Sequence, residues 1–152
     1  MPDPKLLTRI ENYCVYRERA QQEVRDKLYE WGVFPSEVEA TISALIEGNF
    51  LNEERFANAY ASGKFRIKRW GKTKIKQGLK LRKVPDKLIA KALNGLDARE
   101  YEKTLKTLLE KKSFSIKEQS PLKRRYQLMQ FAYGKGFESD LIVSAIEELD
   151  LQ

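Results

Sequence analysis

Apolar residues recur along this chain at intervals of three and four positions, the spacing that places side chains on one face of an α-helix. Leu6, Leu7, Ile10, Tyr13 and Cys14 follow it in the first segment. Every segment with a clear period has this spacing, and capping or turn residues separate the segments. The pattern therefore predicts an all-α protein of nine helices. The predicted helices begin near Pro4, Gln21, Ser36, Asn52, Gly71 or Thr73, Asp86, Asp97, Ser120 and Asp140.

Local sequence signals sharpen some of these boundaries. Ser36 and Glu39 have the spacing of a capping box, which predicts the start of the third helix. Asn52 is a preferred N-cap residue and predicts the start of the fourth. Residues 113–119 are the least regular stretch, so we expect the loosest loop there.

Six apolar positions recur in a common register at shifts of 51 and then 53 residues. The three copies are Val24, Leu28, Val33, Val38, Ile42 and Leu45; Ile75, Leu79, Val84, Ile89, Leu93 and Leu96; and Leu128, Ala132, Phe137, Ile142, Ile146 and Leu149. Periodicity within single helices does not account for a register that also holds across the turns between helices. The repeat predicts three tandem three-helix modules, elongated or curved, at residues 1–50, 51–96 and 97–152.

Positive charge is concentrated in residues 64–91, which contain twelve Lys and Arg residues and a single acid, Asp86, in a protein of net charge +7. Lys68, Lys72, Lys76 and Lys80 recur at every fourth position and are expected on one helix face, where like charges cost roughly 0.2–0.5 kcal/mol per pair. A solvated lysine face is one interpretation. The near absence of compensating acids favours an anion-binding surface instead. The predicted binding residues are Lys64, Arg66, Lys68, Arg69, Lys72, Lys74, Lys76, Lys80, Arg82, Lys83 and Lys87.

Two further features bear on this surface. Phe65 and Trp70 stand among the cations and could either stack on nucleic-acid bases or belong to the core. A smaller basic cluster, Lys123, Arg124 and Arg125, could extend the surface.

Other function classes are disfavoured by what the chain contains. It has no histidine, the most common general base and transition-metal ligand, and its single cysteine, Cys14, lies in an apolar segment that predicts a small buried side chain. Gly71-Lys72-Thr73 resembles the end of a phosphate-binding loop, but Arg66 stands where that motif requires its first glycine. We therefore expect no enzymatic activity, cofactor or metal. The lack of a long apolar segment and the lone cysteine predict a cytoplasmic protein with no membrane contact.

Two motifs resemble the RecX regulatory proteins. Phe50-Leu51-Asn52-Glu53-Glu54-Arg55-Phe56-Ala57 is similar to the family's acidic Arg-Phe-Ala segment, and Gly71 to Leu79 is similar to the basic helix that follows it. The chain departs from the family pattern at Gly78, where glutamate is usual, and at Lys83, where glycine is usual.

The resemblance implies three repeated three-helix modules and a non-enzymatic protein, expected to be monomeric, that binds filaments of the RecA recombinase on single-stranded DNA. It further implies that binding mainly inhibits RecA ATPase, strand exchange and coprotease activity. Two alternatives stay open from the residues alone. One is a stand-alone helical DNA- or RNA-binding module that acts without RecA, and the other is a helical scaffold whose lysines bind nothing.

Overall fold

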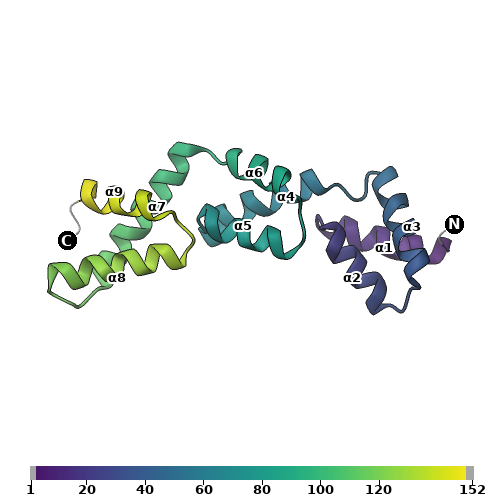
Figure 1. The fold of residues 1–152 in the computed structure, drawn as a ribbon, viewed down its shortest axis with the longest axis horizontal. Helices are drawn as coiled ribbons and strands as arrows, with labels where there is room; N and C mark the ends of the chain where they lie inside the picture. The colour runs from purple at the N-terminus through teal and green to yellow at the C-terminus, as the bar shows by residue number, and fades with distance from the viewer. Residues whose placement is uncertain (1–2, 150–152) are drawn as a thin grey trace. The chain divides into compact units, whose positions relative to one another are not determined.

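The computed structural model describes residues 3–149, and all regular structure in that part of the chain is helical (Figure 1). The all-α prediction is confirmed. The elements in order are α1 (Pro4–Tyr16), α2 (Gln21–Glu30), α3 (Pro35–Glu47), α4 (Glu53–Gly63), the π-helix η1 (Lys64–Lys68), α5 (Lys72–Leu81), α6 (Asp86–Asn94), α7 (Ala98–Ser115), α8 (Pro121–Gly134) and α9 (Ser139–Leu149). No helix within residues 3–149 is long and apolar enough to span a bilayer.

The described residues form two compact units. The first comprises residues 3–60 and 78–92, and the second comprises residues 61–77 and 93–149. The boundaries fall inside α4, α5 and α6, so each unit includes part of the predicted middle module. The predicted module boundaries themselves stay a prediction.

The first unit is built around α1, α2 and α3, with α2 in contact with both of the others (Figure 1). Their apolar faces meet in one core. It contains Ile10, Cys14, Val24, Leu28, Val38, Ile42, Leu45 and Leu51. Burial raises the pKa of the Cys14 thiol to about 11, as expected for an unreactive side chain.

In the second unit α7, α8 and α9 contact one another pairwise (Figure 1). The buried positions of α7 are Tyr101, Leu105 and Leu109, one side of an 18-residue helix. The helices α8 and α9 bury Leu128, Ala132, Ile142, Ala145 and Ile146. This core fixes which face of α7 is turned outward.

The predicted repeat appears as three copies of one turn. Gly32, Lys83 and Gly136 are equivalent positions, and all three have a positive φ, at 78°, 57° and 98°. The next residue closes the same bond in each copy, from N–H to the carbonyl five residues earlier. Every repeated apolar position is buried or half-buried. The six apolar positions that recur in the sequence therefore correspond to a repeat in the structure.

One predicted capping motif was wrong. Helix α3 begins at Pro35, with Phe34 as an N-cap that offers no side-chain bond, so Ser36 and Glu39 form no capping box. Proline suits the first helical turn because it has no N–H to satisfy, and Glu39 instead pairs with Arg25 at 2.8 Å. The Asn52 prediction is confirmed, since its side chain accepts a bond from the Arg55 N–H at 2.8 Å.

The predicted loop at residues 113–119 is also shorter than expected, because α7 continues to Ser115. The remainder is held by Arg124, whose guanidinium donates to the carbonyls of Ser113, Ile116 and Glu118 at 3.0–3.1 Å. The side chain of Ile116 is buried.

Candidate anion-binding surface

The basic segment begins with an irregular helical turn. Helix α4 is followed directly by η1, whose C-cap is Arg69, a residue in the left-handed conformation with φ of 58°. The Lys64 carbonyl accepts bonds from the Arg69 and Trp70 N–H groups, which closes the wide turn. Lys68 therefore lies in η1, before α5 begins. The predicted ladder is corrected, since Lys72, Lys76 and Lys80 share α5 but Lys68 does not.

The start of α5 is capped by groups far along the chain. Three consecutive backbone N–H groups, which would otherwise lack hydrogen-bond partners, donate to oxygen atoms of residues between 101 and 136. The pairs are Gly71 with the Lys135 carbonyl (2.8 Å), Lys72 with the Tyr101 hydroxyl (2.8 Å) and Thr73 with the Gly136 carbonyl (2.9 Å). Because these donors are occupied, this helix end does not offer the open N–H groups by which helix starts bind phosphate.

The close approach at this cap depends on two glycines. A Cβ atom at Gly71 would overlap the backbone of Gly136 and Phe137. A Cβ atom at Gly136 would overlap Lys74, and its φ of 98° is itself unfavourable for other residues. The glycine of the Gly71-Lys72-Thr73 segment thus serves packing.

Tyr101 connects the cap to the core. Its hydroxyl also donates a short hydrogen bond to the Glu138 carboxylate. Burial, together with that bond, raises the pKa of Tyr101 well above its ordinary value. Phe65 packs against the Tyr101 ring at a centroid distance of 5.7 Å and is 7% exposed. The burial of Phe65 favours its interpretation as a core residue over a role in stacking on a base.

Among the predicted cations of the second unit, four have exposed side chains with no hydrogen-bond or ion-pair partner within residues 3–149. They are Arg66, Lys68, Arg69 and Lys76. In the first unit the same is true of Lys80, Lys83 and Lys87. No partner within residues 3–149 occupies these seven side chains, so an external anion can reach them.

Other predicted cations already interact with their own unit. The Nζ atoms of Lys64 and Lys74 lie 4.9 and 4.8 Å from the centroid of the Trp70 ring, and Lys72 Nζ lies 5.0 Å from that of Tyr101. A base that stacked on Trp70 would compete with these ammonium groups. The stacking role of Trp70 stays a prediction.

Arg82 has a structural role in the first unit. Its guanidinium donates to the Gly78 carbonyl at 3.0 Å and to the Tyr60 hydroxyl at 3.4 Å, and it lies 3.8 Å from Glu23. Burial alone would raise the pKa of Glu23, but bonds from Arg17 and the Ala20 N–H, with the charges of Arg17 and Arg82, lower it overall. Arg82 is thus committed to internal contacts.

Gly78, one of the departures from the family pattern, has a steric explanation. A Cβ atom there would overlap the hydroxyl end of the Tyr60 side chain. The tyrosine ring fills the space that a glutamate would need.

The three side chains of the smaller basic cluster, Lys123, Arg124 and Arg125, differ in their contacts, and its binding role stays a prediction. Arg124 holds the end of α7, as described above, and Arg125 lies 3.6 Å from Glu147. Only Lys123 of the three is exposed without a partner within residues 3–149. Two of its three charges are therefore engaged within the second unit.

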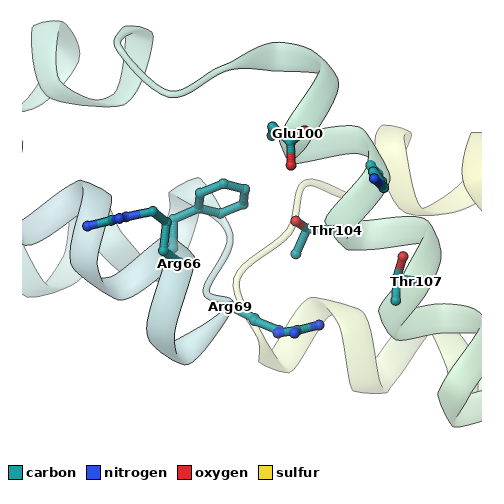
Figure 2. A pocket seen from close by; sticks show the side chains of 7 residues that line it. Arg66, Arg69, Glu100, Thr104 and Thr107 are labelled. Carbon is teal, nitrogen blue, oxygen red and sulfur yellow. The ribbon is translucent and has the colours of Figure 1, made fainter.

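A hollow of about 330 Å³ lies between η1 and α7, within the second unit (Figure 2). Its lining comprises Phe65, Arg66, Arg69, Glu100, Lys103, Thr104 and Thr107. The residues from α7 were not predicted as site residues. Their spacing at positions 100, 103, 104 and 107 is that of one helix face, but a polar face on an exposed helix is too common to indicate a site.

Within residues 3–149 no group of three His, Cys, Asp or Glu side chains is placed to hold a metal ion. The fold defines a class of all-helical proteins built from repeated three-helix units.

Comparison with known proteins identifies the family. Three family models match in order: "RecX, first three-helix domain" over residues 8–45, the second over residues 52–93 and the third over residues 100–146. The chain belongs to the RecX family of regulatory proteins.

Individual relatives agree with this assignment. The regulatory protein RecX of Clostridium perfringens is 31% identical over 133 residues, which is 86% of this chain and 62% of that protein. The protein of the same name from Thermotoga sp. is 29% identical over 136 residues, or 89% of this chain and 78% of the relative. The match to the Bacillus mycoides relative spans 51% of its length, so the chain covers about half to three fifths of some relatives.

Solved structures show the same fold. The crystal structure of RecX from Lactobacillus salivarius superimposes with a TM-score of 0.87 at 26% identity and covers 97% of this chain and 96% of that one. A second crystal structure, titled regulatory protein RecX, has a TM-score of 0.84 at 22% identity, covers 97% of this chain and 71% of its own, and supports the fold alone.

Proposed function

We propose that this protein binds filaments of the RecA recombinase on single-stranded DNA and restrains their activity without being an enzyme itself. The observation that supports this most directly is the set of unpaired, exposed cations in residues 66–87 of a RecX family chain. A nucleoprotein filament presents repeated phosphates and acidic side chains, so it suits a surface of separate positive charges.

The mechanism we propose is restraint by bridging. Cations of the basic segment would bind the anionic groove of the filament, while the flanking modules would contact neighbouring RecA subunits. A bridge between subunits opposes the rearrangements that accompany ATP turnover, strand exchange and coprotease activity. Inhibition is the expected direction for all three.

The direct test is the RecA ATPase rate on single-stranded DNA as this protein is added. We expect the rate to fall to a plateau at saturating protein. Lys76→Glu with Lys80→Glu should shift the inhibition curve to higher protein concentration, because two unpaired cations become anions. A matched control, Lys111→Glu with Lys117→Glu, changes the same charge at two exposed lysines outside the basic segment. An unchanged ATPase rate at saturating wild-type protein would refute the proposal.

The unpaired cations also support a second candidate, a module that binds DNA or RNA without RecA. If five to eight cations met phosphates, the logarithm of the association constant should fall with the logarithm of salt concentration with a slope of about −3.5 to −7. Nanomolar binding to naked DNA with no effect on RecA would favour this candidate. A scaffold without a binding role predicts instead that the charge-reversal variant behaves as the wild type in both assays.

A further inference from the structure

The hollow between η1 and α7 has no assigned ligand (Figure 2). We infer that it binds one phosphodiester group of single-stranded nucleic acid, with Arg69 and Lys103 as charged ligands and Thr104 and Thr107 as hydroxyl donors. This inference rests on the proposed function in one respect, since it supplies a direct nucleic-acid contact within the filament complex.

Charge is the first argument. Three cations, Arg66, Arg69 and Lys103, line the hollow together with one acid, Glu100. None of the three cations has an ion-pair partner within residues 3–149, and all are exposed. Unpaired like charges around one concave surface repel one another, and a bound anion relieves that repulsion. The excess of cations over acids selects an anionic ligand.

Geometry is the second argument. Glu100, Lys103, Thr104 and Thr107 lie on one face of α7, because residues three and four apart are neighbours on a helix. The other face buries Tyr101, Leu105 and Leu109 in the core. The orientation of the polar face is therefore fixed by packing, so the backbone positions that carry its donors are set before any ligand arrives.

The side chains from η1 complete the site. Arg69 extends toward α7, whereas Arg66 extends away from it (Figure 2). Arg69 is thus the first ligand, and Arg66 supplies charge nearby. The left-handed backbone of Arg69, with φ of 58°, follows the end of η1 and brings this side chain into the lining. Phe65, almost fully buried, provides an apolar base.

The chemistry of the lining agrees with a phosphodiester, and the hollow, at about 330 Å³, is large enough to admit one. Two non-bridging oxygens can accept bonds from a guanidinium, an ammonium and hydroxyl groups together. An acidic protein side chain has the same charge, but Lys68 and Lys76 offer further unpaired cations in the same unit. A polymer with a charge at every unit uses such additional cations, which favours nucleic acid.

The test measures binding of a fluorescent oligothymidylate by anisotropy over a series of salt concentrations. Lys103→Ala and Arg69→Ala should each weaken binding by about 3- to 10-fold, the loss of one exposed charge-assisted contact. Each should also reduce the magnitude of the salt slope by about 0.7, the value for one phosphate on a single strand. Thr107→Val should weaken binding without changing the slope.

Two further variants distinguish binding at the hollow from attraction by the overall positive charge of the surface. Arg99→Ala removes one exposed cation from the same helix but from outside the lining, and should change affinity by less than about twofold because its charge is screened. Glu100→Gln removes the opposing carboxylate and should strengthen binding. Circular dichroism verifies folding, and Lys103→Ala is an exposed helix substitution that favours retention of structure.

Three results would overturn the inference. The first is an equal loss from Arg99→Ala and Lys103→Ala, which would indicate diffuse attraction. The second is weaker binding by Glu100→Gln. The third is a wild-type protein that inhibits RecA but does not bind oligothymidylate, which leaves the proposed function standing and removes the phosphate site. If instead the lining variants lose oligothymidylate binding while the wild type leaves RecA unaffected, the site stands and the proposed function fails.

Discussion

Gly78 offers a sharp test of the packing described for the first unit. In an exposed helix, replacing glycine by alanine stabilises the fold by about 1 kcal/mol, because glycine loses more backbone entropy. At Gly78 the new Cβ would overlap the Tyr60 hydroxyl and would lie 2.8 Å from Cζ of the ring. The ring has little room to move, since it packs against Phe56 at 5.7 Å and under the Arg82 guanidinium at 4.9 Å.

Overpacking of this kind costs roughly 1–3 kcal/mol, so Gly78→Ala should lower the free energy of unfolding despite the gain in helix propensity. Tyr60→Phe removes the overlapping oxygen and should recover about half of that loss, a coupling of about 1 kcal/mol. Urea unfolding followed by circular dichroism measures all four members of the cycle. The matched control is Gly63→Ala, at a residue in helical conformation whose Cβ would meet nothing within 4 Å.

Gly63→Ala should leave stability unchanged or raise it by about 0.5–1 kcal/mol. The reasoning is refuted if Gly78→Ala stabilises the protein as Gly63→Ala does, or if Tyr60→Phe leaves the effect of Gly78→Ala unchanged. Either result would mean that the Tyr60 ring does not occupy the space beside α5.

Three other predictions concern stability. Lys83→Gly should raise the free energy of unfolding by about 1 kcal/mol, because a non-glycine residue pays roughly 1–2 kcal/mol for the positive φ at that turn; urea titration measures it. Tyr101→Phe should lower the free energy of unfolding by about 1–3 kcal/mol, because the Lys72 N–H and the Glu138 carboxylate both lose a partner; thermal unfolding measures it. Glu23 has a pKa below its ordinary value of 4.5 in the folded protein. Its contribution to the free energy of unfolding is therefore complete above pH 4.5 and is lost as the pH falls through the lower folded value. In urea titrations over this acidic range, the stability of Glu23→Gln should fall less with decreasing pH than that of the wild type.

The sequence alone was sufficient to predict that the chain forms helices and that their arrangement repeats. Apolar spacing predicts a helix wherever one face must be buried, and the same register across Gly32, Lys83 and Gly136 follows because each copy makes the same turn. The lone Cys14 was likewise recognisable as a core residue, because it lies on the apolar face of its helix.

Neither the irregular turn at η1 nor the partners of individual charged side chains could be predicted from a single sequence. A π-helical segment of 5 residues is too short to show a hydrophobic period of its own, so η1 and the left-handed Arg69 could not be predicted, and the expectation that Lys68 shares a helix with Lys72 fails. Charge counts also do not show which cations are committed internally. Arg82 and Arg124 resemble their basic neighbours in the sequence, yet one packs over Tyr60 and the other holds the end of α7. In both cases the role of the arginine depends on its partners in the tertiary structure.

The cap at the start of α5 has a consequence for synthesis of the protein. Gly71, Lys72 and Thr73 leave the ribosome long before Tyr101, Lys135 and Gly136, whose oxygens receive their hydrogen bonds. At about 5–20 residues per second, the first turn of α5 waits roughly 3–13 seconds for residues 64 positions downstream, so this helix can be completed only late in translation. The N-terminal helices α1 to α3 wait for a nearer partner, because the N–H of Gln21 at the start of α2 donates to the Glu53 carboxylate, 32 residues downstream, so these helices can be completed much earlier.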